Sequence, residues 1–220
     1  MSMNPVTHYP THYPFHLVLP RDYGQTSTAY PLLLFLHGRG ECGDNLELVK
    51  RHGPPKLADS TTKPAFLEPF IVLSPQCPAD QDWSAKGLIV LLDEATQQLR
   101  IDPSRIYLTG ISMGAYGAWR LALAQPQRFA ALCPICGGGE PELVDRLQDI
   151  PIWIFHSAGD SIVPVSESDR MFTALQHCNA DVIYTRYRAL NHVETWEEAY
   201  AYPALYAWFL RHSHDPRALG

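Results

Sequence analysis

The chain has 220 residues, 46% of them hydrophobic, which is enough for one large α/β domain with a buried core. Its formal net charge of −6 and its scattered Lys and Arg residues argue against a nucleic-acid partner. It contains no run of about 18 apolar residues, so we expect no membrane span. Residues 1–14 lack the apolar segment of a secretory signal, and we expect a cytoplasmic location.

Five cysteines are an odd number, so at least one thiol is unpaired within the chain. Cys133 and Cys136 have the Cys-x-x-Cys spacing of zinc and redox sites, but no second pair of metal ligands follows them. The pair also ends an apolar run, whereas a thioredoxin-like motif opens a helix. We interpret both as buried strand thiols of a reduced protein and expect no metal and no cofactor.

Short apolar runs alternate with helical patterns along the chain. The expected strands are 15–19, 31–36, 70–73, 106–109, 130–135, 152–155 and 182–187. The expected helices are 46–51, closed by Gly53-Pro54-Pro55, then 87–100, a helix that begins at Met113 and shows Ala118, Leu121, Ala122 and Ala124 at helical spacing, then 140–147, 166–178 and 196–212, the last kinked at Pro203. This alternation predicts a single-domain α/β fold with a mostly parallel central sheet flanked by helices and no large lid. The domain is expected to span 15–212, after an N-terminal extension (1–14) and before a C-terminal tail (213–220).

One segment organises the rest of the chain. A strand pattern runs into Gly110-Ile111-Ser112-Met113-Gly114 and then into a helical pattern. A strand, a sharp turn with a serine and a helix form the nucleophile elbow of Gly-x-Ser-x-Gly hydrolases. The turn forces the serine into a strained conformation, and a Cβ at either glycine would collide with the neighbouring strand or helix. A structural turn with an idle serine is the alternative.

A serine nucleophile needs a base and an orienting carboxylate, which follow it in this fold in the order acid, then histidine. Asp160 and His192 satisfy that order, each in a loop beyond an expected strand. In open α/β sheets the chemistry lies at the carboxyl ends of the strands. We therefore predict a Ser112–Asp160–His192 triad, although Asp160 alone could cap a turn and His192 alone could be a solvent-facing histidine.

Other residues compete for these roles. Glu194 is too close in sequence to His192 to orient it comfortably, and Asp181 lies on the wrong side of a strand. His37 also ends a strand, but its place before Gly38 indicates packing beneath a loop. None of the three replaces a predicted triad member.

An oxyanion needs preorganised hydrogen-bond donors. We expect the backbone N–H groups of Met113, first in the helix after the elbow, and of Arg39, in the glycine-rich loop 37–44, to supply them. The Arg39 side chain is either surface charge or a contact for an anionic substrate group, and the sequence does not decide between the two.

Four stretches carry a family resemblance: His-Gly-x-Gly-Glu-x-Gly-Asp-Asn (37–45), residues 101–114, Pro-Ile-Cys-Gly-Gly-Gly (134–139) and the segments around the predicted acid and base. Over about residues 13–212 the chain resembles the phospholipase/carboxylesterase family of α/β hydrolases, and within it the small lidless esterases often labelled "predicted peptidase". The resemblance implies carboxylic-ester hydrolysis without a metal or cofactor. It also matches Trp83 to a tryptophan that is either a wall of the substrate pocket or a loop-packing aromatic.

Two positions depart from the family pattern. Ala115 stands where relatives usually have glycine, which crowds the elbow slightly. Leu190-Asn191 stands where a glycine often precedes the histidine, which affects the loop of His192.

The residues together predict a serine carboxylesterase acting on small to medium esters through an acyl-enzyme on Ser112. A peptidase or amidase uses the same parts and ranks second, and a thioesterase or lysophospholipase ranks third. A non-catalytic binding module is the alternative from another class. The expected partner is a small-molecule ester, and the sequence does not determine the oligomeric state.

Overall fold

The structure, a computed structural model, describes residues 13–59, 63–178 and 180–214. Most of the expected N-terminal extension and C-terminal tail therefore lies outside the described residues. Tyr13 does not behave as part of an extension. Its side chain is 3% exposed, contacts the ring of Trp83 at a tilt and accepts a hydrogen bond from the backbone N–H of Ser84. The folded domain thus includes at least Tyr13, because this tyrosine is part of the core.

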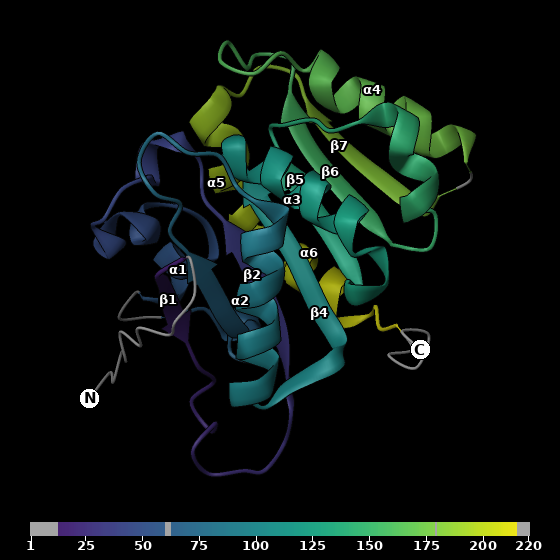
Figure 1. The fold of residues 1–220 in the computed structure, drawn as a ribbon. Coiled ribbons are helices and arrows are strands. Elements are labelled where there is room, and N and C mark those ends of the chain that lie inside the picture. The colour runs from purple at the N-terminus through teal and green to yellow at the C-terminus, as the bar shows by residue number, and fades with distance from the viewer. Residues whose placement is uncertain (1–12, 60–62, 179, 215–220) are drawn as a thin grey trace.

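Seven strands form one sheet within the described residues, in the order β1-β3-β2-β4-β5-β6-β7 (Figure 1). The strands are β1 (Phe15–Val18), β2 (Tyr30–Leu36), β3 (Ile71–Pro75), β4 (Ile101–Ile111), β5 (Ala131–Ile135), β6 (Ile152–Ser157) and β7 (Val182–Tyr187). β1 runs antiparallel to β3, and the other neighbours are parallel. β2, β3 and β5 are buried along their whole length, as expected of parallel strands covered on both faces.

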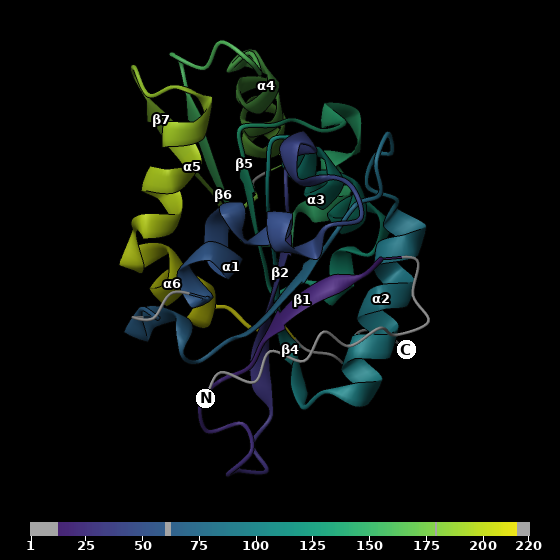
Figure 2. The same ribbon diagram turned by 90° about the vertical axis from the view of Figure 1, so that its left-hand side faces the viewer.

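Helices cover both faces of the sheet (Figure 2). The α-helices are α1 (Gly53–Ala58), α2 (Ala85–Gln98), α3 (Met113–Ala124), α4 (Ser166–His177), α5 (His192–Ala201) and α6 (Pro203–Leu210). Short 3-10 helices are η1 (Arg39–Glu41), η2 (Leu46–Arg51), η3 (Ala65–Leu67), η4 (Pro126–Arg128) and η5 (Pro141–Leu147). One core lies between the sheet and α2, α3 and α4, and a second lies between the sheet and α1, α5 and α6. The expected α/β-hydrolase architecture is confirmed.

The helices differ from the sequence prediction at two places. Gly53-Pro54-Pro55 begins α1 and does not merely close the preceding helix, because proline suits the first turn, where its missing N–H has no intrahelical partner. The expected helix 196–212 is two helices separated at Tyr202, and α6 starts at Pro203. The first of these begins already at His192, so the predicted loop histidine lies in the first turn of a helix.

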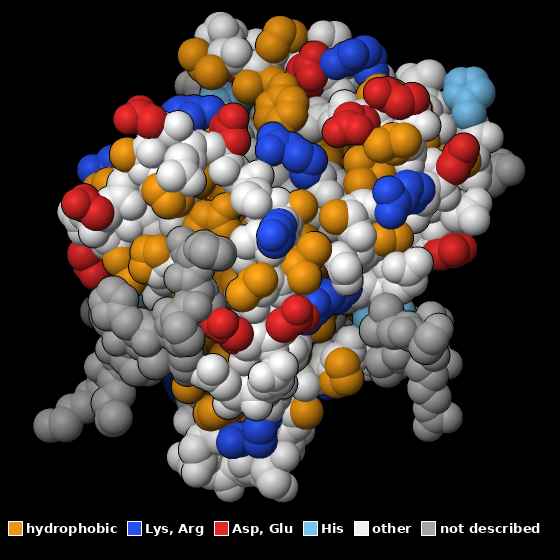
Figure 3. Space-filling view, viewed as in Figure 1, with side chains coloured by type: hydrophobic (Ala, Val, Ile, Leu, Met, Phe, Trp, Pro, Cys, Tyr) orange, Lys and Arg blue, Asp and Glu red, His pale blue; other side chains and the backbone are white. Residues whose placement is uncertain are grey.

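The surface and the helix lengths bear on possible partners. On the face shown in Figure 3, acidic and basic side chains are interspersed, and no basic patch dominates. No helix among the residues that the structure describes is long and apolar enough to cross a bilayer.

Candidate active site

The predicted elbow connects β4 to α3. Ser112 has φ 52° and ψ −120°, a backbone conformation that side-chain-bearing residues rarely adopt. Its backbone N–H donates to the carbonyl oxygen of Ile135 on the neighbouring strand β5 at 2.9 Å. The turn is therefore held by the sheet, and the serine is presented beyond the carboxyl end of the strand.

Two glycines make this turn possible. A Cβ placed on Gly110 would lie 2.3 Å from the carbonyl oxygen of Gly114. A Cβ placed on Gly114 would lie 2.0 Å from the carbonyl oxygen of Leu36 at the end of β2. Both distances are far below van der Waals contact with backbone atoms, which have little room to move. The predicted steric need for glycine at both positions is confirmed.

The crowding expected from Ala115 has a local solution. A Cβ on Gly137, after β5, would lie 2.7 Å from the Cβ of Ala115. The alanine methyl group therefore occupies space that the glycine leaves open. The departure from the family pattern at this position does not distort the elbow.

Three side chains meet beyond the carboxyl ends of β4, β6 and β7. Ser112 Oγ lies 2.9 Å from His192 Nε2, and His192 Nδ1 lies 2.5 Å from Asp160 Oδ2. The serine hydroxyl donates to Nε2, and the N–H at Nδ1 donates to the carboxylate. His192 is 8% exposed, whereas the Asp160 side chain is fully buried. The structure thus brings the three predicted triad residues into one hydrogen-bonded chain.

The Asp160 carboxylate is held in place at both oxygens. Oδ1 accepts the backbone N–H groups of Ile162 and Val163, each at 2.9 Å. Burial raises the pKa of this carboxyl, but the hydrogen bonds from His192 and from these backbone groups outweigh it and leave the pKa below its ordinary value. The carboxylate is therefore charged at neutral pH, as an orienting group for a histidine has to be.

His192 owes its position to a helix cap. Asn191 caps α5: its side chain accepts the N–H of Glu194 at 2.9 Å, and the Glu194 carboxylate accepts the N–H of Asn191 at 2.9 Å. This capping box also accounts for Glu194, whose carboxylate is engaged away from His192 Nδ1. The loop before it runs against Gly159, where a Cβ would lie 2.9 Å from the Leu190 carbonyl oxygen. The capping box thus positions His192 without the glycine that often precedes the histidine in relatives.

The loop after β2 lies beside the serine. A Cβ on Gly38 would lie 3.6 Å from Ser112 Cβ. Arg39 and Met113 are the first residues of η1 and α3, and N–H groups in the first turn of a helix have no intrahelical acceptor. Both predicted oxyanion donors therefore stand at helix starts on either side of Ser112.

The buried His37 ring holds this loop in place through two hydrogen bonds. It is fully buried, its Nε2 accepts the backbone N–H of Cys77 at 3.0 Å, and its Nδ1–H therefore donates to the Gly38 carbonyl oxygen at 2.6 Å. Burial lowers the pKa of His37 to about 4. On the other side, the buried carboxylate of Glu41 accepts a hydrogen bond from the Gly38 backbone. The packing role expected of His37 fits this geometry.

Trp83 is buried beneath the glycine-rich loop. Its side chain is 1% exposed, and its Nε1–H donates to the carbonyl oxygen of His37 at 3.1 Å. It packs against Gly117 of α3, where a Cβ would lie 2.7 Å from Trp83 Cβ. Of the two readings of this residue, the loop-packing one matches the structure, because the ring supports the glycine-rich loop from the core.

The Arg39 side chain is exposed and pairs with the exposed Asp82, with Nη2 and Oδ1 2.5 Å apart. Its second nitrogen, Nη1, donates to the Gln81 carbonyl oxygen at 3.4 Å. The guanidinium group thus rests on the loop before α2. An exposed pair of this kind contributes about 0–1 kcal/mol, so the group is free to exchange partners.

The two cysteines of the Cys-x-x-Cys segment do not share a site. Cys133 and Cys136 are both buried with free thiols, and burial raises the pKa of each. Cys136 Sγ lies within 4.8 Å of ligand atoms of Asp160 and His192, a grouping that could surround a cation. His192 Nδ1 and the thiol carry hydrogens there, whereas a metal needs lone pairs. The arrangement therefore suits the hydrogen-bonded triad better than a metal.

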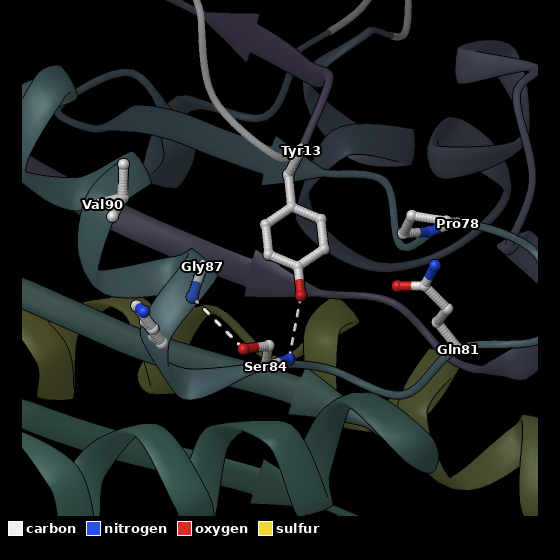
Figure 4. Close-up of a pocket in the computed structure, with 7 residues that line it drawn as sticks. Tyr13, Pro78, Gln81, Ser84, Gly87 and Val90 are labelled. Carbon is white, nitrogen blue, oxygen red and sulfur yellow. Dashed lines mark hydrogen bonds between the residues drawn. The ribbon is translucent and has the colours of Figure 1, made fainter.

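A hollow of about 390 Å³ lies between Tyr13 and the start of α2 (Figure 4). Its lining residues are Tyr13, Pro78, Gln81, Ser84, Lys86, Gly87 and Val90. Two hydrogen bonds join its lining residues: Ser84 Oγ caps α2 by accepting the N–H of Gly87, and the backbone N–H of Ser84 donates to the Tyr13 hydroxyl. No member of the triad lines it.

Three further residues at the site were not singled out from the sequence. The ring of Trp196 meets that of His192 edge-on with centroids 4.7 Å apart, and Glu41 is buried beside Gly38. His156 contacts the Asp160 carboxylate from the end of β6. The position of His156 at a strand end, four residues before the predicted acid, could have indicated this contact from the sequence. The other two contacts depend on tertiary packing.

The sheet order, the elbow and the serine–histidine–carboxylate chain together define an α/β hydrolase. The model of the phospholipase/carboxylesterase family matches residues 73–201, and the chain belongs to this family. A protein named as a proposed esterase, NocK, of Nocardia uniformis subsp. tsuyamanensis is 30% identical over 147 residues, which are 61% of this chain and 41% of that protein.

Solved structures agree with this assignment. A thermostable esterase superposes with a TM-score of 0.83 at 32% identity, covering 92% of this chain and 60% of the other. The S-formylglutathione hydrolase of Staphylococcus aureus superposes with a TM-score of 0.69 at 16% identity, covering 96% and 98%, and shares the fold. The chain thus spans less than two thirds of the length of NocK and of the thermostable esterase.

Proposed function

We propose that the protein is a serine carboxylesterase that hydrolyses small to medium carboxylic esters through an acyl-enzyme on Ser112. The observation that carries the proposal is the continuous chain Ser112 Oγ–His192 Nε2 (2.9 Å) and His192 Nδ1–Asp160 Oδ2 (2.5 Å). A serine hydroxyl becomes a useful nucleophile when a histidine within this reach accepts its proton. The family and its esterase relatives support the same chemistry.

In the first half-reaction, Ser112 Oγ attacks the ester carbonyl carbon and its proton passes to His192 Nε2. The N–H groups of Met113 and Arg39 stabilise the oxyanion, each contributing about 3 kcal/mol. The tetrahedral intermediate collapses, the C–O bond to the alcohol breaks, and the alcohol leaves with the proton from His192. Asp160 stabilises the imidazolium ion without taking its proton.

In the second half-reaction, water attacks the acyl-enzyme while His192 again accepts a proton. The carboxylic acid leaves, and the proton returns to Ser112 Oγ. The Arg39 side chain is exposed, and exchange of its partner Asp82 for an anionic substrate group would favour acidic esters. All the steps use groups of this chain and water.

The test is hydrolysis of p-nitrophenyl esters from acetate to decanoate by the wild type, Ser112→Ala and the control Ser104→Ala. Ser104 is a hydroxyl bound locally to Asp102 at the start of β4. We expect Ser112→Ala to lose about 10⁴-fold or more in kcat and Ser104→Ala to lose little. The chain-length optimum measures the acyl pocket.

Substrates with one acyl group and different leaving groups separate the alternatives. An anilide hydrolysed as fast as the ester would favour a peptidase or amidase, and a preferred thioester would favour a thioesterase. If no ester is hydrolysed and a fluorophosphonate fails to label Ser112, the proposal is overturned in favour of a binding module.

A further inference from the structure

The Asp160 carboxylate contacts two histidines. Its Oδ2 lies 2.5 Å from His192 Nδ1 and also 3.2 Å from His156 Nε2. His156 is the next-to-last residue of β6, and its side chain is completely buried. It therefore touches the carboxylate from within the core.

The hydrogen-bond partners determine which nitrogen of His156 carries a hydrogen. Nε2 faces two acceptors, Asp160 Oδ2 at 3.2 Å and the Val163 carbonyl oxygen at 3.1 Å. A bare lone pair between two oxygen acceptors would be repelled by both, so Nε2 is protonated and donates. Nδ1 lies 2.8 Å from Ser168 Oγ on α4. The Ser168 hydroxyl has one hydrogen, which in a neutral ring with its hydrogen on Nε2 is shared between Nδ1 and the Gly137 carbonyl oxygen, also 2.8 Å away.

The chain of contacts continues back to the elbow. Ser168 Oγ also lies 2.8 Å from the Gly137 carbonyl oxygen, and a Cβ on Gly137 would lie 3.1 Å from the Ser112 carbonyl oxygen. Asp160 is thus linked through His156 and Ser168 to the backbone that flanks the nucleophile. A displacement of His156 would therefore affect both Asp160 and the backbone beside Ser112.

We propose that His156 is a positioning residue for the esterase reaction: its Nε2–H holds Asp160 Oδ2 toward His192 Nδ1, and Ser168 fixes the ring of His156. The inference rests on the proposed function. Its consequence is chemical as well as steric, because a donor on Oδ2 draws negative charge away from the oxygen that stabilises the His192 imidazolium ion. Without that donor, Asp160 binds the imidazolium more strongly and is oriented less well.

The titratable and charged groups in and around the Asp160–His192 pair come from several elements. They are Asp160 of the same loop, His192 of α5, Cys136 after β5, Tyr116 of α3, Glu167 and Asp169 of α4, and Arg186 of β7. Arg186 is bound to Asp169, and Tyr116 is bound to Glu167. The hydrogen bond from His156 is a direct side-chain contact of the Asp160–His192 pair, so its removal should change the pair.

The test compares pH profiles of kcat and kcat/KM on p-nitrophenyl acetate for the wild type, His156→Leu, His156→Gln and Ser168→Ala. For His156→Leu we expect kcat to fall about tenfold, KM to stay within about twofold, and the acid limb of kcat/KM to move up by about half a pH unit. His156→Gln keeps an amide N–H near the position of Nε2 and should stay close to the wild type. Ser168→Ala should shift in the same direction as His156→Leu, but less.

His16→Leu is the matched control. His16 is a buried histidine of β1, at the other end of the sheet, so this variant changes stability without touching the triad. The low-field proton NMR signal of His192 Nδ1–H supplies a second readout, which should move in His156→Leu and stay in His16→Leu. If His156→Leu does not fold, His156→Gln and Ser168→Ala still carry the comparison.

The proposal is overturned if the His156 and Ser168 variants only lose stability, as His16→Leu does, with kcat, the acid limb and the NMR signal unchanged. It is also overturned if His156→Gln behaves like His156→Leu, because the N–H would then not be the important group. A wild type without esterase activity would overturn the proposed function, and the NMR comparison would still report on His156.

Discussion

The two halves of the candidate site are built in different ways. The half on β2 and β4 contains the loop 37–41 and the elbow, and backbone packing determines its shape. A Cβ at Gly114 would lie 2.0 Å from the Leu36 carbonyl oxygen, so the two strand ends touch through the glycine. The half on β6, β7 and α5 contains Asp160 and His192, and side-chain hydrogen bonds of 2.5–3.2 Å determine its shape.

This difference predicts different kinds of failure. The glycine contacts carry no titratable group, so a substitution there affects folding first, and pH acts on this half through the buried side chain of His37. The hydrogen-bonded carboxylate and imidazole can be substituted without unfolding the protein. A substitution there therefore affects catalysis first. The three predictions below test this contrast, in order of expected effect.

Asp160→Asn should lower kcat by about 10⁴-fold, equivalent to about 5 kcal/mol of transition-state stabilisation. The asparagine oxygen can still accept the N–H groups of Ile162 and Val163, so the loop should fold. The amide cannot stabilise the His192 imidazolium ion as an anion does. Steady-state kinetics on p-nitrophenyl acetate measures the effect, with the exposed Asp145→Asn as control. A loss below tenfold would remove Asp160 from the triad.

Gly114→Ala should lower the free energy of unfolding by more than about 4 kcal/mol, because the new methyl group meets backbone atoms of β2 that cannot move aside. Gly40→Ala is the matched control, since a Cβ there would have no neighbour within 4 Å. Urea unfolding of both variants measures the difference. Equal stabilities would show that the elbow is more adaptable than the packing indicates.

The loop of His37 should make stability depend on pH. Burial lowers the pKa of His37 to about 4 in the folded protein, against about 6.5 in the unfolded chain. Between these values the unfolded chain binds a proton and the folded protein does not. The contribution is therefore complete above pH 6.5 and is lost as the pH falls toward 4, to a total of about 3 kcal/mol.

His37→Asn isolates this contribution, because His16, His52 and His156 also have lowered pKa values and add to the pH dependence of the wild type. Urea unfolding at pH 7.5 and at pH 4.5 gives the difference for each protein. We expect a smaller difference in His37→Asn than in the wild type. The same difference in both would mean that His37 takes up its proton without disturbing the loop.

Much of the site could be predicted because its signals are local. The strand–glycine–serine–glycine–helix pattern around Ser112 needs no distant residue to be recognised, and the geometry at Gly110 and Gly114 agrees with it. The order of Asp160 and His192 along the chain follows from the alternation of strands and helices. Each lies where a parallel strand has just ended.

What sequence reasoning missed depends on contacts between distant segments. His192 was expected in a loop, but Asn191 and Glu194 form a capping box that starts α5 at the histidine. The alternatives for Trp83 could not be separated from the sequence, because the ring is buried by Tyr13 and Gly117, which are far from it in sequence.

The sequence by itself determined the α/β architecture, the elbow and the identity of three residues that could act together, because apolar periodicity and glycine sterics are properties of short segments. Only the tertiary structure decided which atoms of those residues meet, that the Arg39 side chain rests on Asp82, and that the Asp160 carboxylate has a second histidine. Those outcomes depend on how parallel strand ends are placed side by side. That placement results from burying two apolar faces of one sheet at once, and no single segment encodes it.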